Sequence, residues 1–381
     1  MGPKRIPLVA GNWKMNFDHL EATYFVQQLA WNLRAIHFDY KRCEIALMPS
    51  FTSLRSVQVA VESDNLKIRY GAQAVSVTSQ GAFTGDVSAD MIAHLGCSYV
   101  IVGHSERRKY HPEDDANIVD QVRAVLAAGM QPILCVGESY EERRKGIELD
   151  FAVGQVHDVT RDLSDEEAAK LIVAYEPVWA IGTGMVATPQ SAQDAARAIR
   201  NDLSDTFGTR VGETVRILYG GSVSSKNAVE LINEPDVDGF LIGGSALKVD
   251  ELTRMHLQAD IGNNRLKTFK KHGWTLDFFN TMRYYQKQCL RTGGSPVSAM
   301  ATVKLVLQIL LVILSLLLTL LILMHKGKGG GLSDMFGGGL TQNAGSSGVA
   351  EKNLNRWTVI IALLWVAIII ALGLMTKFNL I

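Results

Sequence analysis

The sequence predicts an α/β protein that begins with a closed (β/α)8 barrel and continues into a C-terminal two-helix transmembrane hairpin. Short β-branched or apolar runs alternate with amphipathic stretches over about 250 residues, the usual size of such a barrel. Polar side chains and Gly-Gly pairs follow several of these runs, where barrels build their active sites. Two long apolar runs come later, and each is long enough to cross a bilayer core of ~30 Å.

Eight segments have the length and composition of buried strands. They are Pro7–Trp13, Ile45–Met48, Ile68–Ala72, Tyr99–Val102, Pro132–Val136, Ile172–Tyr175, Arg216–Tyr219 and Gly239–Ile242. The helix-like stretches between them include Leu20–Ala35, Ala116–Ala128, Ser191–Leu203 and Lys226–Ile232. One helix start is well marked, because Thr188 is a capping residue and Pro189 suits the first helical position. A doubly wound sheet is the competing architecture, but no GxGxxG follows the first strand.

Composition excludes several classes of function. Lys and Arg number 38 and Asp and Glu number 38, so the net charge is zero and nothing favours binding to nucleic acid. The four cysteines form no CxxC pair, which argues against a zinc site or a disulfide framework and favours a reducing compartment. No metal is expected. The N-terminus leads into a strand rather than a signal peptide, so we expect the first domain to remain in the cytosol.

The segment around Glu176 suggests a general base. This carboxylate ends a predicted strand, and a carboxylate held away from water is a stronger base. Pro177 stiffens one side of the following loop, Gly182 and Gly184 free the other, and the apolar residues Val178–Ile181 between them suit a lid. The competing interpretation is a buried strand end followed by a structural turn.

Other predicted strand ends carry chemistry as well. Asn12 and Lys14 follow the first strand and His104 follows the fourth, while Gly-Gly-Ser triplets at 220–222 and 243–245 follow the last two. Taken singly, Asn12 is explained as a turn residue, Lys14 as a solvated lysine and His104 as a core histidine. The two Gly-Gly-Ser triplets are then explained as tight turns. Fold stability explains their joint placement poorly. The pattern therefore favours an active site with a phosphate held by backbone amides.

Five segments carry a resemblance to a known family. They are Gly-Asn-Trp-Lys-Met-Asn at 11–16, Gly-His-Ser-Glu-Arg-Arg at 103–108, the stretch 174–184, Tyr-Gly-Gly-Ser-Val at 219–223 and Leu-Ile-Gly-Gly-Ser-Ala-Leu at 241–247. In order and spacing, residues of about 5–259 resemble the triosephosphate isomerase family, which implies a first domain of residues 1–259. That family interconverts dihydroxyacetone phosphate and glyceraldehyde 3-phosphate through an enediolate, as a homodimer without cofactor.

The resemblance assigns roles to these residues. Glu176 is the base, and His104 is the neutral electrophile that polarises the carbonyl and moves protons between oxygens. Lys14 supplies a fixed positive charge to the anionic intermediate, and Asn12 hydrogen-bonds the substrate. The groups implied for substrate and phosphate binding are Asn12, Lys14, Gly182, Ser222, Gly243 and Gly244. The runner-up enzyme is another phosphate-binding barrel, which would not need this combination of lid, lysine and histidine.

Residues Gln73–Val87 resemble the loop that reaches the partner subunit in this family. Thr84 is therefore expected near the neighbour's active site, and Asp86 stands where a Glu is usual. Glu106 is expected to order Lys14 or the subunit interface. We expect Cys135 to be a packed thiol in the core.

The C-terminal part has a different character. Residues 260–299 form a basic connector dotted with Trp and Tyr, which we expect to be poorly ordered. Residues 300–381 resemble the SecG family of two-span subunits of the protein-export translocon. The glycine-rich loop 325–339 and the stretch 349–356 carry this resemblance, between the apolar runs Leu305–Met324 and Thr358–Met375. It implies a place in the inner or plasma membrane and a translocon partner; a plain membrane anchor is the alternative.

Charge around the hairpin raises a conflict of topology. Lys326, Lys328, Lys352 and Arg356 lie between the spans, and the positive-inside tendency places such a loop in the cytosol. Both flanks would then face outward, including a barrel that needs a cytosolic substrate. Either the hairpin inserts inverted, or Met300 starts a separate protein and the joined chain is a gene-model accident. We favour the second hypothesis because the connector is unpatterned and a Met begins the second resemblance.

Overall fold

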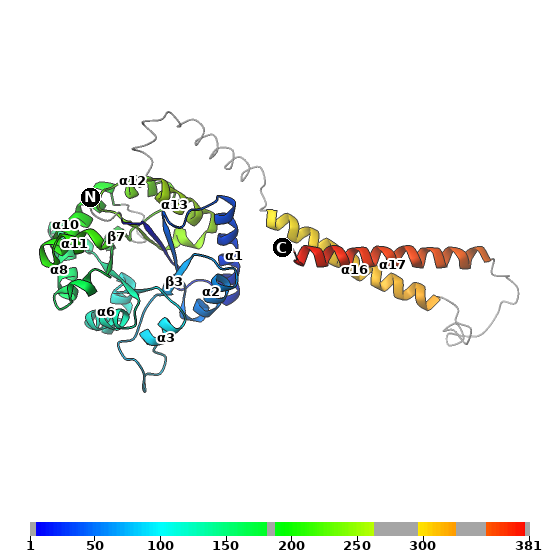
Figure 1. Cartoon of the computed structure of the whole chain (residues 1–381), viewed down its shortest axis with the longest axis horizontal. Coiled ribbons are helices and arrows are strands. Elements are labelled where there is room, and N and C mark those ends of the chain that lie inside the picture. The colour runs from blue at the N-terminus through cyan, green and yellow to red at the C-terminus, as the bar shows by residue number, and fades with distance from the viewer. Residues whose placement is uncertain (1–4, 181–186, 263–295, 325–347, 378–381) are drawn as a thin grey trace, which may run out of the picture. The chain divides into compact units, whose positions relative to one another are not determined.

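The computed structural model describes residues 5–180, 187–262, 296–324 and 348–377 (Figure 1). The chain divides into two compact units, Met1–His272 and Gly273–Ile381. In the first unit, eight parallel strands pair each with the next, and the last pairs with the first. The predicted (β/α)8 barrel is therefore confirmed.

The strands lie close to their predicted bounds. They are β1 (Leu8–Asn12), β2 (Glu44–Met48), β3 (Arg69–Ala72), β4 (Tyr99–Val102), β5 (Gln131–Val136), β6 (Ile172–Tyr175), β7 (Arg216–Tyr219) and β8 (Gly239–Ile242). The bounds of β4, β6, β7 and β8 match the prediction; β2, β3 and β5 differ by one residue at one end, and β1 is shorter than predicted by one residue at each end. Polar residues cause part of this difference. Glu44, for example, joins β2 because its N–H donates to the carbonyl of Pro7 over 2.8 Å.

Helices follow the strands around the outside of the barrel (Figure 1). They are α1 (His19–Ala35), α2 (Phe51–Ser63), α3 (Ala89–His94), α4 (Ser105–Tyr110), α5 (Pro112–Ala116), α6 (Ile118–Ala127), α7 (Tyr140–Arg144), α8 (Glu148–Thr160), α9 (Asp165–Ala168), α10 (Pro189–Phe207), α11 (Thr209–Thr214), α12 (Ala228–Ile232) and α13 (Val249–Gly262), with short 3-10 turns at Val178–Ala180 and Gly244–Leu247. Thr188 caps α10 as predicted, since its hydroxyl accepts from the N–H of Ser191 over 3.1 Å.

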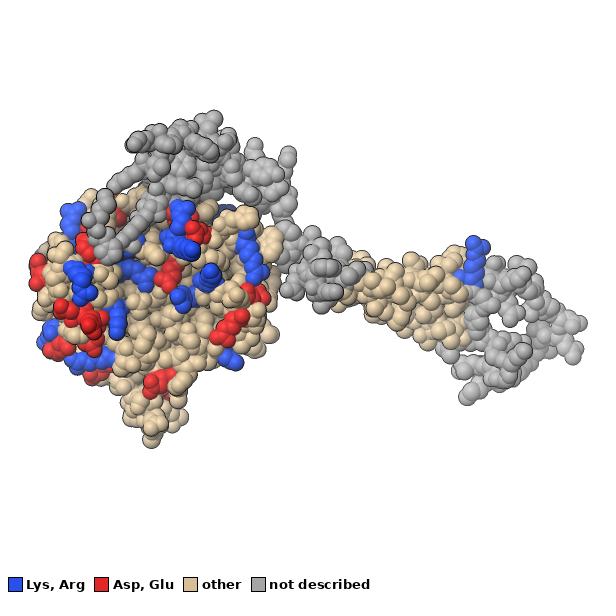
Figure 2. Space-filling model, in the orientation of Figure 1, with Lys and Arg blue, Asp and Glu red and all other residues tan. Residues whose placement is uncertain are grey.

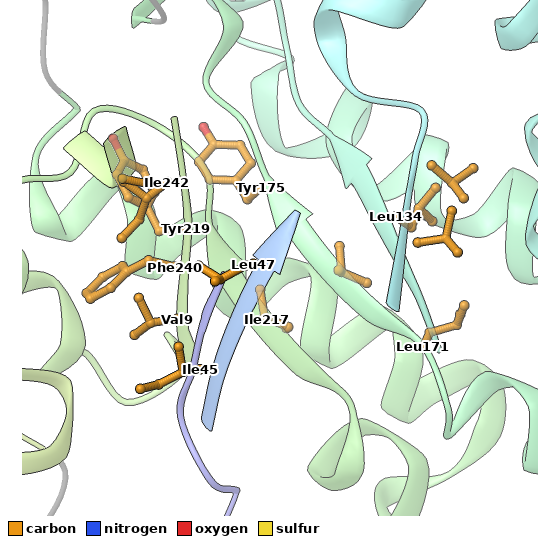
Figure 3. Close-up of a cluster of buried hydrophobic side chains, with 14 of the residues drawn as sticks. Val9, Ile45, Leu47, Leu134, Leu171, Tyr175, Ile217, Tyr219, Phe240 and Ile242 are labelled. Atoms are coloured by element: carbon orange, nitrogen blue, oxygen red, sulfur yellow. The ribbon is translucent and has the colours of Figure 1, made fainter. Parts of the chain in front are cut away.

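Strand side chains alternate between the barrel interior and the layer beneath the helices, as the period of two requires. One buried cluster fills the interior and consists of Leu8, Ala10, Ala46, Met48, Tyr99, Ile101, Ile133, Cys135, Ile172, Ala174, Leu218 and Leu241. A larger cluster joins the outer faces of the strands to the helices, and Figure 3 shows members of it such as Val9, Ile217 and Phe240. This packing makes the strand ends rigid supports.

The same alternation turns two of the predicted site residues toward the barrel interior. Asn12 continues the inward set of β1, and Glu176 continues that of β6. His104 does not follow the alternation of β4, because the inward position after Ile101 falls on Gly103. Gly103 has a φ of +69°, which turns the chain at this point. That bend brings His104 into the cavity at the strand ends.

The second unit contains helices α16 (Pro296–Met324) and α17 (Gly348–Lys377), which pack against each other. Trp365 donates its indole N–H to the hydroxyl of Ser315 over 2.7 Å, and that hydroxyl donates to the carbonyl of Leu311 over 2.8 Å. Met300 lies inside α16. No helix is long and apolar enough to cross a membrane within the ranges that the structure describes. Of the predicted connector, 260–299, residues 260–262 lie in α13 and 296–299 in α16, while 263–295 and the glycine-rich loop 325–339 lie outside the described ranges.

Candidate active site

A cavity of about 520 Å³ opens at the C-terminal ends of the strands. Its lining includes predicted residues from five strand ends, namely Asn12, Lys14, His104, Glu176, Ser222, Gly243 and Gly244. Gly182 lies in 181–186, outside the described residues, so its predicted role stays a prediction. Thr84 does not line this cavity and is exposed on the loop between β3 and α3. The structure thus brings the predicted acid, base and cation together.

Glu176 and His104 lie in contact at the centre of the site. His104 Nε2 is 3.1 Å from Glu176 Oε1, and Glu176 Oε2 accepts from the backbone N–H of Ser105 over 3.0 Å. His104 Nδ1 accepts from the N–H of Glu106 over 3.1 Å, so the proton of the neutral ring sits on Nε2. The two side chains are only 2% and 6% exposed by residue. A base and a proton donor therefore face one space.

Lys14 is held from several directions in a strained backbone conformation, with φ of +52°. Its N–H donates to Asn12 Oδ1 over 3.0 Å, and its carbonyl accepts from Gln73 Nε2 over 2.9 Å. The same Gln73 amide donates to the carbonyl of Met48 over 2.7 Å. The Lys14 ammonium lies 2.5 Å from Glu106 Oε1, one of the two roles expected for Glu106. These contacts fix the position of the positive charge.

The glycines after β7 and β8 make room for this machinery. A β-carbon at Gly243 would lie 3.1 Å from Lys14 Cε and 3.7 Å from its Nζ, so the end of the lysine side chain packs close to that backbone. A β-carbon at Gly220 would lie 2.9 Å from Glu176 Cγ. Gly137, after β5, is closer still, because its β-carbon would come within 1.8 Å of the Glu176 carbonyl oxygen. Small residues on neighbouring strands thus let the base and the cation sit close to the backbone.

Glu138 supports the site from outside the cavity and was not singled out from the sequence. It is fully buried and accepts from the indole N–H of Trp179 over 2.7 Å and from the hydroxyl of Tyr175 over 3.0 Å. Burial raises the pKa of this carboxyl, while these hydrogen bonds and Arg143 oppose the rise. The contacts fix the residues on both sides of Glu176. A carboxylate directly after a predicted strand is the signal that could have identified it.

The cysteine thiols described in the barrel are unreactive. Burial raises the pKa of Cys43 and Cys135 and raises that of Cys97 to about 12, so these thiols stay protonated. Cys135 is packed in the barrel interior, in agreement with its expected role. Across the part of the chain that the structure describes, no three His, Cys, Asp or Glu side chains are grouped to hold a metal ion.

Comparison with known proteins agrees with this geometry. The family model described as triosephosphate isomerase matches residues 7–259. The chain belongs to the triosephosphate isomerase family. The triosephosphate isomerase of Bifidobacterium longum strain DJO10A is 84% identical over 255 residues, which cover 67% of this chain and 96% of the relative. Those of Nocardia farcinica and Streptomyces coelicolor are 49% and 47% identical over 251 residues, covering 66% of this chain and 95% and 96% of the relatives.

The C-terminal unit matches a second family. The model described as preprotein translocase SecG subunit matches residues 304–380, a range that includes most of α16 and all of α17. The triosephosphate isomerase match ends at residue 259, inside α13, so the two matches do not overlap. Both resemblances expected from the sequence are confirmed.

Proposed function

We propose that the barrel interconverts dihydroxyacetone phosphate and D-glyceraldehyde 3-phosphate by proton transfer through an enediolate. One observation carries this proposal: the Glu176 carboxylate, the Nε2–H of His104 and the Lys14 ammonium line one cavity. Moving a proton between adjacent carbons needs a base beside the carbon and a donor beside the oxygens. An anionic intermediate also needs a fixed positive charge. The cavity supplies all three.

Glu176 takes the first proton. When the ketone enters, its carbonyl oxygen replaces Glu176 as the acceptor of the His104 Nε2–H, which polarises the carbonyl. Glu176, released from His104, removes a proton from carbon 1, and the electron pair moves onto the carbonyl oxygen to give the enediolate. Because the N–H of Glu106 occupies Nδ1, the imidazole reacts as a neutral donor through Nε2 only.

The second half of the reaction returns the proton. His104 passes its Nε2 proton to one enediolate oxygen and recovers a proton from the other, and Glu176 delivers its proton to carbon 2 to give the aldehyde. Lys14 stabilises the negative charge throughout, from a position fixed by Gln73 and Glu106. Ser222, Gly243 and Gly244 hold the phosphate through backbone amides at the same cavity, and Asn12 hydrogen-bonds the substrate.

A coupled assay tests the proposed activity. The full chain is given dihydroxyacetone phosphate, and the aldehyde formed is oxidised by an excess of a dehydrogenase that reports it by absorbance. We expect saturable turnover that inorganic phosphate inhibits competitively. Absence of turnover in a folded preparation would contradict the proposal.

We also propose that the barrel works as a cytoplasmic homodimer in central carbon metabolism. Met15, next to the catalytic lysine, is 96% exposed, and Phe83 on the loop of Thr84 is 52% exposed. Such side chains suit a subunit interface in which Thr84 reaches the partner's active site. Sedimentation velocity should give a dimer for the native chain and a monomer for Phe83→Asp. Val229→Asp, on the exposed face of α12, should leave the dimer intact.

For the C-terminal unit we propose a membrane-inserted SecG-like hairpin, with the protein-export translocon as its partner. The family match and the two apolar runs of the sequence, Leu305–Met324 and Thr358–Met375, support this role. Its orientation depends on whether the joined chain is made. An immunoblot of native cells against the tail should show a short product if Met300 starts a separate protein. A single band near the fused mass of 41.8 kDa would contradict that hypothesis.

A further inference from the structure

The bend at Gly103 has a dedicated hydrogen-bond partner. The ladder between β4 and β5 ends at the pair Val102 and Leu134, and the next residue of each strand presents a carbonyl to one side chain. Arg108 donates from Nε to the carbonyl of Gly103 over 2.8 Å and from Nη2 to the carbonyl of Cys135 over 3.1 Å. Its guanidinium therefore continues the sheet where backbone pairing stops.

Arg108 also closes the turn that carries the proton donor. Its backbone N–H donates to the carbonyl of His104 over 3.0 Å, while its guanidinium holds the residue before His104. A β-carbon at Gly103 would lie 3.0 Å from Arg108 Nη2, so the guanidinium packs directly against the bend. The third nitrogen of the fork, Nη1, is paired with Asp115 in α5. The side chain is thus fixed on three sides.

We propose that Arg108 is a positioning residue for the isomerase reaction, which sets the place of His104 by holding the Gly103 bend against β5. This inference rests on the function proposed above, because it acts through His104. The bend is what departs from strand alternation and turns the imidazole into the cavity. The adjoining strand β6 carries Glu176, whose N–H donates to Val136 at the end of β5 over 2.7 Å. Arg108 therefore helps to fix the distance between donor and base.

The geometry needs an arginine rather than any cation. Two carbonyls from different strands and one carboxylate are bound by separate nitrogens of one planar group, a pattern that the single ammonium of lysine does not reproduce. Arg108 lines no part of the cavity, so it has no direct route to the substrate within the described residues. Its loss should therefore lower kcat more than it changes KM.

A double-mutant cycle in the full chain tests this role. Arg108→Met should lower kcat by roughly 10-fold to 100-fold with KM changed less than about threefold, because a displaced catalytic group loses this much. In a His104→Gln background the same substitution should cost less than about threefold, since there is no imidazole left to position. Arg108→Lys should recover only part of the activity. Arg123→Met, which removes an exposed ion-paired arginine from α6, should stay within twofold of the native chain.

Thermal unfolding and the two backgrounds separate the outcomes. An Arg108→Met chain that keeps native kcat, or that loses the same factor with and without His104, would overturn the positioning role. If Arg108→Met does not fold, Arg108→Lys is judged in its place by the same two ratios. Failure of the proposed function looks different. In that case the native chain does not turn over triose phosphate, or His104→Gln has native activity, and the positioning role falls with it.

Discussion

The barrel unit and the helical pair use apolar side chains in opposite ways. In the barrel, the Leu, Ile and Val side chains of the strands are almost fully buried between interior and helices. In the helical pair, the large apolar side chains described are mostly exposed, and Ile368 is the buried one among the described residues. Figure 2 shows acidic and basic residues interspersed over the visible face of the barrel and a mostly uncharged surface on the helices.

The difference lies in pattern rather than in overall hydrophobicity. Strand residues alternate between two buried faces and end at polar groups, which leaves those groups fixed at a cavity. The helices instead carry continuous apolar sequence that two packed helices cannot bury on all sides. Ser315 and Trp365 are hydrogen-bonded to each other across the pair, so the face on which the two helices pack also holds a polar contact. The comparison thus contrasts a barrel that fixes polar groups at a cavity with a pair of helices that leaves most of its large apolar side chains exposed.

The largest effect should come from the base of the barrel site. Glu176→Gln should lower kcat by about 10³-fold or more, and Glu176→Asp by roughly 10²-fold, because a shorter side chain misplaces the carboxylate. KM should change much less. Steady-state kinetics of the full chain measure both. Glu166→Gln, on the exposed face of α9, is the matched control and should be neutral. A Glu176→Gln chain that keeps nearly native kcat would contradict the assignment of the catalytic base to this end of the barrel.

Backbone closeness should give the next effect. Gly137→Ala should destabilise the barrel by about 3 kcal/mol or more, since its β-carbon would meet the Glu176 carbonyl oxygen at 1.8 Å. Gly154→Ala in the middle of α8 meets nothing within 4 Å and should instead stabilise by roughly 0.5–1 kcal/mol. Urea unfolding compares the two. Equal effects would mean that close packing at the strand ends does not limit stability.

A buried histidine should make barrel stability depend on pH. Burial lowers the pKa of His256 in α13 to about 3, whereas the unfolded chain has the ordinary value near 6.5. The unfolded state therefore binds more protons below pH 6.5, and stability is lost as pH falls through that window. The free energy of unfolding then falls with a slope that approaches ~1.4 kcal/mol per pH unit. The total loss between pH 7 and pH 5 is about 2 kcal/mol.

Urea unfolding of the barrel at the two pH values measures this dependence. His256→Leu should flatten it, and His19→Leu, at the exposed start of α1, should leave it unchanged. A native chain whose stability does not change between pH 7 and pH 5 would show that His256 does not titrate as its burial requires.

The helical pair should respond to the loss of its polar contact by a smaller amount. Ser315→Ala removes the acceptor of the Trp365 indole N–H and should cost about 1 kcal/mol, since bonds of this kind contribute ~0.6–2 kcal/mol. Thr319→Val is the control, because within the described part of the helical pair the Thr319 hydroxyl bonds only the carbonyl of Ser315 in its own helix. Circular dichroism of the pair in detergent follows the melting. Identical melting of both variants would contradict a stabilising contact between the helices.

Local sequence pattern was enough to predict the barrel and to place candidate polar residues such as Glu176 and His104 at the ends of its strands. Runs such as Tyr99–Val102 predicted strands because buried strands need them, and Thr188-Pro189 predicted a helix start because the cap is local. The supports of the site could not be predicted in this way. Gln73 reaches the carbonyl of Lys14 from a point 59 residues away, and Arg108 reaches Cys135 across 27 residues. Such contacts exist only once the barrel closes.

The most direct test of the division between the two units is the activity of a chain that ends at His272. All described residues of the proposed machinery lie before this point, and the barrel is a compact unit by itself. The coupled assay with dihydroxyacetone phosphate should give the same kcat and KM, within about twofold, for the shortened and the full chain. A loss of turnover of more than tenfold in a folded, shortened chain would contradict the claim that the barrel alone carries the chemistry.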